Sequence, residues 1–217
     1  MQKAEKLLPG YFYHIYNRGN NRENIFFEEK NYFYFLELWS KYVFPVAKTF
    51  AYVLLKNHFH FLVRIEDFFQ TSAQNATQTS EVSETSEVLG AEVADVSKRI
   101  SRQFSNMFNA YAKAINKKYD RTGSLFQTRF GRKRVTNEAY LIYLIHYIHF
   151  NPQRHKFVDD FRDYPYSSYH AIVSNRRTKI AREDVIDMFG DSKAFVEYHA
   201  QEKDYGVTRS LVEDDFY

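Results

Sequence analysis

The stretch KTFAYVLLKNHFHFLVR, residues 48–64, decides the fold because it predicts a β-hairpin. Residues 48–55 are strongly apolar and rich in the β-branched and aromatic side chains that strands favour. Lys56 and Asn57 form the predicted turn, and residues 58–64 form the second strand. Side chains alternate along a strand, so His58 and His60 point to one face and Phe59 points to the other, into the core.

Before the hairpin, residues 11–17 (YFYHIYN) predict a strand and residues 18–22 (RGNNR) predict a turn. An amphipathic helix follows from about residue 28, because its apolar residues recur at helical spacing. Pro45 ends this helix.

After the hairpin, an apolar stripe at helical spacing over residues 100–115 predicts a second helix. Residues 132–135 predict a short strand. A third helix runs from Asn137 to Phe150, with Thr136 or Asn137 as its N-cap and Pro152 as its terminator. The order β-α-β-β-α-β-α predicts an α+β, ferredoxin-like split β-α-β sandwich, in which an antiparallel sheet carries its helices on one face.

Two segments fall outside this pattern. Residues 70–92 are rich in Ser, Thr, Gln and Glu, lack aromatic residues, and predict a mobile insertion, although residues 87–96 also fit a helix. The predicted catalytic domain spans residues 1–171, and a C-terminal extension, residues 172–217, contains two helical patterns.

Composition excludes several classes of protein. The 217 residues include no Cys, which rules out disulfides and thiolate metal sites and fits a reducing, cytoplasmic location. Residues 1–10 lack the apolar core of a signal peptide, and no apolar run approaches the ~20 residues that span a bilayer, so no membrane partner is expected. The net charge of +3 says little about partners, but 21 Phe and 18 Tyr are enough to fill a core and to stack on unpaired bases.

His58 and His60 form a candidate metal site. Two imidazoles side by side on one strand supply two ligands. The alternative is two unrelated histidines on a half-exposed strand, and an H-x-H pair alone does not decide between these interpretations.

Tyr147 and Asn151 form a second candidate pair. Residues four apart share a helix face, so a phenol and an amide oxygen project together. A neutral tyrosine, with a pKa near ~10, is a weak nucleophile that a divalent cation assists by polarising a phosphate. The alternatives are a core aromatic residue and an asparagine that caps the helix end; Tyr143, on the same face, is the rival nucleophile.

Taken together, these motifs resemble the HUH single-tyrosine transposases, and most of all the REP-associated tyrosine transposases. The blocks that carry the resemblance extend from about Tyr11 to Ala171 in the family's order. They are YHIYNRGNNRENIF, the HFH strand, YDRTGSLFQTRF, YIHFNPQRHKFV and DYPYSSYHA.

The resemblance implies a mechanism and a set of partners. His58 and His60 match the pair that binds a divalent cation, Mg²⁺ or Mn²⁺, and Tyr147 matches the nucleophile. Asn151 matches the residue that completes the metal shell, a position at which the wider family commonly has Gln. Family members act on hairpins in single-stranded DNA through a 5′-phosphotyrosine intermediate and are usually homodimers.

Basic residues are candidate DNA contacts because a run of cations suits a phosphate backbone, although a solvated surface explains the same charges. The candidates are Arg18, Arg22, Lys117, Lys118, Arg121, Arg129, Arg132, Lys133 and Arg134. His14, His146 and His149 are expected to be structural.

Two other functions remain open. A domesticated HUH nuclease, a relaxase or a replication initiator would keep the chemistry and change the biology. A non-catalytic module that binds single-stranded nucleic acid would use the sheet and its aromatic residues, but it leaves His58, His60 and Tyr147 without a role.

Overall fold

The structure is a computed structural model that describes residues 5–67, 86–127 and 129–201, with only the backbone of residues 86–92. The strands are β1 (Phe12–Arg18), β2 (Ala47–Leu55), β3 (His58–Ile65) and β4 (Gly131–Arg134). The helices are α1 (Glu29–Tyr42), α3 (Ser86–Lys118), α4 (Glu138–Arg154), α5 (Tyr169–Val173), α6 (Arg182–Phe189) and α7 (Ser192–Ala200), with short 3-10 helices at Asn20–Arg22 and Phe161–Asp163. The predicted order β-α-β-β-α-β-α is confirmed from β1 to α4.

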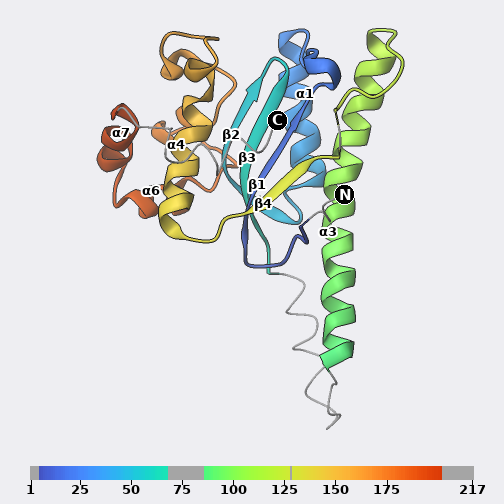
Figure 1. The fold of residues 1–217 in the computed structure, drawn as a ribbon. Coiled ribbons are helices and arrows are strands. Elements are labelled where there is room, and N and C mark those ends of the chain that lie inside the picture. Colours follow the sequence, from blue (N-terminus) through green and yellow to red (C-terminus); the bar gives the residue numbers. More distant parts are fainter. Residues whose placement is uncertain (1–4, 68–85, 128, 202–217) are drawn as a thin grey trace.

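The four strands form one antiparallel sheet in the order β2-β3-β1-β4 (Figure 1). Strand β3 lies between β1 and β2, which α1 connects, so the split β-α-β prediction is confirmed. The predicted hairpin is also present, because Leu55 pairs with His58 across the turn at Lys56 and Asn57. Strand β4 forms one edge of the sheet.

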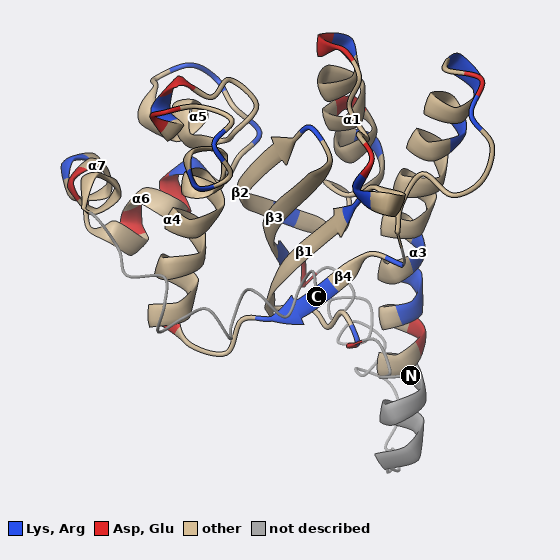
Figure 2. Ribbon diagram, turned by 45° about the horizontal axis from the view of Figure 1, so that its top comes forward, with Lys and Arg blue, Asp and Glu red and all other residues tan. Residues whose placement is uncertain are grey.

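The sheet carries helices on both faces, which corrects the expectation that all helices share one face. Helices α1 and α3 cover one face and α4 covers the other (Figures 1 and 2). The reason lies in the hairpin, where both faces are apolar: Phe59 and Phe61 pack toward α1 and α3, while Val53 and Leu62 pack in the core with α4. Strands that are apolar on both faces need cover on both.

The C-terminal helices extend the apolar core that lies between the sheet and α4, which we call the second core. Ile180, Val185 and Phe195 are buried in the same cluster as the apolar side chains of α4. Residues 86–92, the last part of the predicted insertion, belong to α3, whereas 68–85 and 202–217 lie outside the described residues.

Helix α4 continues past Pro152, which corrects the prediction that this proline ends it. A proline in the last turn removes one hydrogen bond, and the turn is closed by the His155 N–H, which donates to the Asn151 carbonyl at 2.9 Å. The helix ends where Lys156 adopts a left-handed φ of 58° and Phe157 N–H donates to the Pro152 carbonyl at 2.8 Å. Asn137 caps the other end by accepting from Tyr140 N–H, as one of the two predicted N-caps.

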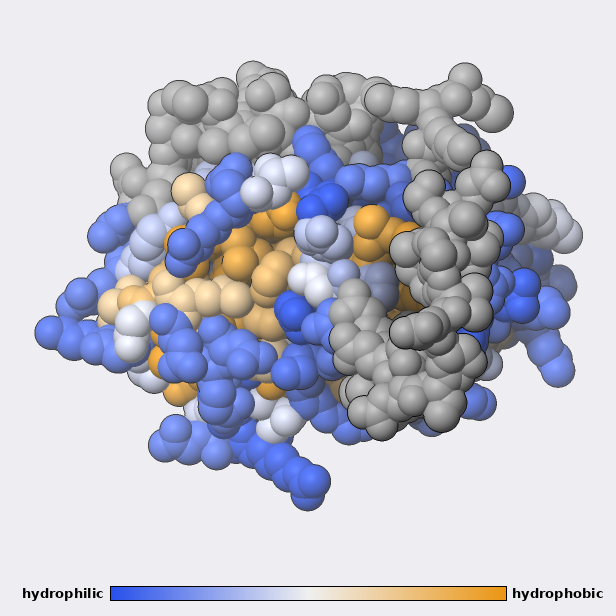
Figure 3. Space-filling model, turned by 90° about the horizontal axis from the view of Figure 1, so that it is seen from below, coloured by the Kyte–Doolittle hydropathy of each residue, from blue (hydrophilic) through white to orange (hydrophobic). Residues whose placement is uncertain are grey.

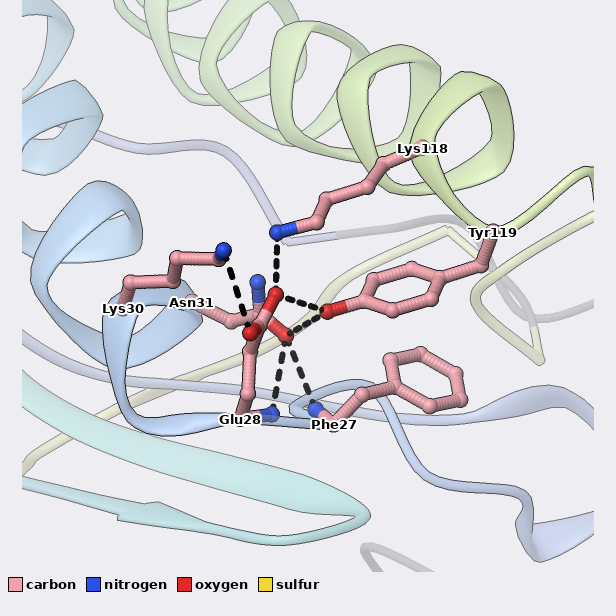
Figure 4. A network of polar contacts seen from close by, with 6 residues as sticks. All are labelled: Phe27, Glu28, Lys30, Asn31, Lys118 and Tyr119. Atoms are coloured by element: carbon pink, nitrogen blue, oxygen red, sulfur yellow. Dashed lines mark hydrogen bonds and ion pairs between the residues drawn. The ribbon is translucent and has the colours of Figure 1, made fainter.

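A polar network joins the start of α1 to the end of α3 (Figure 4). The Glu28 carboxylate accepts from Lys118 and, at 2.5 Å, from the Tyr119 hydroxyl. Asn31 Oδ1 accepts from the Phe27 and Glu28 N–H groups at 2.9 and 3.2 Å. These contacts hold the pKa of Glu28 at about 2, with the Lys118 hydrogen bond as the largest cause.

The surface has a mixed character. Seen from below, hydrophobic residues gather near the centre of one face and hydrophilic ones border them (Figure 3). Among the described residues, no helix combines the length and the apolar composition needed to cross a membrane.

Candidate active site

His58 and His60 lie side by side on β3 and face α4. Their side chains are 1% and 0% exposed. Phe59, between them, packs into the core on the opposite face, so the predicted alternation is confirmed. Because β3 is an inner strand, both histidines are enclosed by the sheet on two sides and by α4 above.

Each of these two rings is hydrogen-bonded through Nδ1. His58 Nδ1 lies 2.7 Å from Asn57 Oδ1, and His60 Nδ1 lies 2.9 Å from His14 Nε2. Asn57 Oδ1 can only accept, so His58 Nδ1 carries the hydrogen and Nε2 carries the lone pair. Both rings therefore turn Nε2 away from these partners, which is the orientation that a second partner imposes on metal-binding histidines.

The surroundings keep both histidines neutral. Burial lowers the pKa of His58 well below 6.5, and His155 and Arg18 lower it further. Burial also lowers the pKa of His60 well below that value, with His14 as the next cause. A neutral imidazole is the form that binds a cation, so the pair is in the required state at neutral pH.

Helix α4 brings Tyr147 and His155 against this pair. The Tyr147 ring meets the His60 ring edge-on at 5.7 Å between centroids, and the His155 ring meets the His58 ring at 4.9 Å. Asn151 is four residues from each of them, so it lies between them on the helix face that looks toward the histidines.

Asn151 is fully buried, and only one of its two polar side-chain atoms has a hydrogen-bond partner among the described residues. Its Nδ2 donates to the Tyr147 carbonyl at 2.9 Å, and its Oδ1 has no hydrogen-bond partner among the described residues. An unmatched buried amide oxygen costs ~1–3 kcal/mol, so this oxygen is open to a cation or a water molecule. Asn151 does not cap the helix end, because α4 runs on to Arg154.

A divalent cation fits this donor set. Within the described ranges, no three His, Cys, Asp or Glu side chains are grouped so that they could hold a metal ion. The histidine pair and the Asn151 oxygen are a different set, in which two imidazoles and one amide oxygen leave the remaining positions to substrate oxygens and water. Mg²⁺ and Mn²⁺ accept such shells, whereas structural zinc needs four protein ligands.

Tyr147 is better placed than Tyr143. The Tyr143 ring stacks on Tyr147 at 6.3 Å, one turn further from the end of α4. The Arg154 guanidinium lies 5.5 Å from the centre of the Tyr147 ring and makes a cation–π contact with it. Tyr147 is only 3% exposed, so most of its ring is buried against the sheet and α4.

Tyr16 lies over the same face of the sheet. Its ring is 4.9 Å from the His14 ring, and it occupies the space beside Gly131 on β4. A Cβ added to Gly131 would lie 2.2 Å from two atoms of the Tyr16 ring. The glycine thus permits the close approach of this aromatic ring to the edge strand.

His149 belongs to a separate hydrogen-bonded chain, which supports its expected structural role. Its Nδ1 lies 2.9 Å from His199 Nε2, and its Nε2 lies 2.8 Å from Ser168 Oγ. His199 Nδ1 donates to the Phe195 carbonyl, so His199 Nε2 accepts and His149 Nδ1 donates. His146, one turn earlier on α4, stacks on Phe150 at 5.7 Å and lies 5.2 Å from the His199 ring between centroids.

The basic residues predicted to contact DNA occupy three places. Arg18 and Arg22 lie near the His58 end of the sheet, since Arg18 pairs with His58 and Asn57 donates to the Arg22 carbonyl. Lys117, Lys118 and Arg121 lie at the end of α3, where Glu28 pairs with Lys118 and Glu23 pairs with Arg121 at 2.7 Å. Arg129, Arg132, Lys133 and Arg134 lie on or next to β4 (Figure 2).

Sequence reasoning missed two residues of the site, Asn57 and His155. The sequence places Asn57 in the predicted turn, and a residue directly before a ligand histidine can hydrogen-bond to that histidine. His155 follows Asn151 at helical spacing. This spacing has meaning only if the helix continues, and the sequence predicts that the helix ends at Pro152.

Comparison with known proteins gives a distant likeness to a solved structure. No family model and no curated protein matches the chain. A solved structure of a REP-associated tyrosine transposase bound to a REP hairpin is similar over 81% of this chain and 86% of that chain. The TM-score is 0.49 and the sequence identity is 16%, so the functional argument rests on the residues of this chain.

Proposed function

We propose that this chain is a metal-dependent nuclease of the HUH single-tyrosine type, which cuts and rejoins single-stranded DNA beside a hairpin. One observation carries the proposal: Tyr147 and Asn151 on α4 face the His58 and His60 pair on β3. The Tyr147 and His60 rings are 5.7 Å apart, and the buried Asn151 oxygen is unmatched. A phenol, two neutral imidazoles and an amide oxygen are the groups that this chemistry requires.

The chemistry is a phosphoryl transfer to tyrosine. Tyr147 Oη attacks the scissile phosphorus and loses its proton to solvent, while the bond to the 3′ oxygen breaks and that oxygen takes up a proton. The product is a 5′ phosphate ester of Tyr147, and attack by a 3′ hydroxyl reverses the step and reseals a strand. A divalent cation held by His58, His60 and Asn151 would stabilise the charge that develops on the phosphate. The bond energy is conserved, so no nucleotide triphosphate is consumed.

The full proposal includes hairpin DNA as substrate and a homodimer as the active form, as the sequence resemblance implies. A domesticated nuclease acting on repeat hairpins keeps every residue role above. A non-catalytic binding module gives the same hairpin affinity but no role to the Tyr147 hydroxyl.

A covalent-adduct assay tests the proposal. The protein is mixed with labelled hairpin DNA that carries single-stranded arms, taken from the flanks of its own gene, with Mn²⁺, and run on a denaturing gel. We expect a shifted band that needs Mn²⁺ and is absent in Tyr147→Phe. Tyr143→Phe is the matched control, because it removes a neighbouring hydroxyl from the same helix face and should keep the adduct. Tight binding without an adduct would support the binding module instead.

A further inference from the structure

Two adjoining cavities lie along α3 on the side of the sheet opposite His58 and His60. One, of about 420 Å³, lies between α3 and β4, and the other, of about 670 Å³, continues toward the segment that precedes β4. Ser105 and Arg132 line both, so the two form one groove, which we call the α3–β4 groove.

The α3–β4 groove is strongly basic. Among the residues that the structure describes, one acidic side chain, Glu5, lines it. The basic side chains that line it are Lys6, Lys98, Arg102, Lys113, Arg129 and Arg132. Figure 2 marks basic positions in blue on β4 and on the neighbouring helix α3. A groove of this charge recruits a polyanion.

The groove is built to contact phosphates and not bases. Arg132 is held in place by Ser101 Oγ at 2.7 Å and by the Phe130 ring at 4.2 Å. The aromatic side chains at the floor, Phe108, Phe126 and Phe130, are at most 7% exposed and offer no open face to a base. Serine, asparagine and arginine side chains donate to phosphate oxygens, which positions a strand without reading its sequence.

Strand β4 connects the groove to the candidate active site. Residues paired across an antiparallel sheet point to the same face. Arg132 pairs with Ile15 and so faces α3, whereas Lys133 pairs with His14 and so faces α4. Because β4 is an edge strand, cations line both sides of the edge between the groove and Tyr147.

We propose that the α3–β4 groove binds the phosphodiester backbone of the single DNA strand that continues beyond the scissile phosphate, and that this strand crosses the β4 edge at Lys133. The inference rests on the proposed function and adds the path of its substrate.

The test is the salt dependence of DNA binding, measured by fluorescence anisotropy with Tyr147→Phe protein in EDTA so that no cleavage occurs. The probe is a labelled hairpin with a single-stranded arm. Each lost phosphate contact should lower the slope of log K against log salt by ~0.7 for a single strand or ~0.9 for a duplex. We expect Arg102→Ala and Lys113→Ala each to lower it by the single-strand amount. Lys193→Ala, a highly exposed lysine on α7, is the matched control and should leave the slope unchanged.

Two further probes decide which part of the DNA occupies the groove. The arm alone should show the same loss of slope, and the blunt hairpin should show none. Unchanged slopes in both groove variants, or a loss confined to the blunt hairpin, would overturn the inference. An adduct assay that fails while the groove variants lose slope would reject the nuclease and leave the strand-binding groove in place.

Discussion

His60 is oriented by a residue that lies far away in the sequence. Its Nδ1 is hydrogen-bonded to His14 on β1, and 46 positions separate the two residues. The H-x-H spacing predicts that His58 and His60 share a face, but no local pattern predicts a partner on another strand. His14 reaches His60 because the antiparallel register places β1 beside β3, and this register does not follow from the local sequence.

His14→Ala should weaken metal binding without removing a ligand. Loss of the partner that orients a ligand histidine typically costs ~10–100-fold in metal affinity. Mn²⁺ binding, measured by calorimetry in the absence of DNA, checks this, and His14→Gln should recover part of the affinity because an amide can bond to His60 Nδ1. A variant that melts earlier but binds Mn²⁺ as tightly as the wild type would assign His14 a packing role only.

The junction of α1 and α3 depends on an exposed ion pair that responds to pH. The pKa of Glu28 is lowered to about 2 from 4.5, by Lys118 first and then by Tyr119. A lowered carboxylate pKa gives stability that is complete above pH 4.5 and is lost as the pH falls toward 2.

Glu28→Gln should therefore melt slightly below the wild type at neutral pH, and the gap should close as the pH is lowered through that range. Thermal unfolding at a series of pH values and at low salt measures the gap. Added salt should shrink it, because solvent screens exposed pairs. A gap that is independent of both pH and salt would show that Glu28 acts through helix capping alone.

The last turn of α4 shows where local rules fail. The rule that a residue before proline avoids helical geometry predicts an end near Phe150, yet the helix runs to Arg154. The turn is retained because Asn151 and His155 pack against the sheet and backbone hydrogen bonds close it after Pro152. Tertiary packing therefore sets the length of the helix that carries the candidate nucleophile.

At the scale of the whole molecule, the sequence predicts the order and type of the elements but not how they are layered. Apolar stripes such as residues 100–115 and the alternation in residues 58–64 identify helices and strands directly. Which face of the sheet a helix covers depends on which faces are apolar, and therefore on which strand residues point to each face. Val53 and Leu62 are apolar and lie on the second face of the sheet, but their place on that face follows only from the strand register.

The second core contains a buried, neutral histidine, His149, and its neutrality lowers the stability of the fold at acidic pH. Burial lowers the pKa of His149 well below 6.5, and His199 and His146 add to the effect. Between those pKa values the unfolded chain binds a proton that the folded chain does not bind, so stability falls as the pH decreases below 6.5.

Urea unfolding at successive pH values should show this loss, at a slope of up to ~1.4 kcal/mol per pH unit for each such histidine. His149→Gln should reduce the slope, while lowering stability at neutral pH because Ser168 and His199 lose a partner. His170→Gln, at an exposed position on α5, is the matched control. A slope that His149→Gln leaves intact would place the acid sensitivity in another group, such as His58 or His60.

The closeness of Tyr16 to Gly131 makes two distant positions share one volume. Because a single added carbon at position 131 would lie 2.2 Å from the Tyr16 ring, neither position varies independently of the other. In a lineage of related sequences, bulk at 131 is expected only beside a small residue at 16, and such an exchange would leave a cavity next to His14. The edge strand thus constrains the evolution of the candidate active site through a glycine that is not among the candidate site residues.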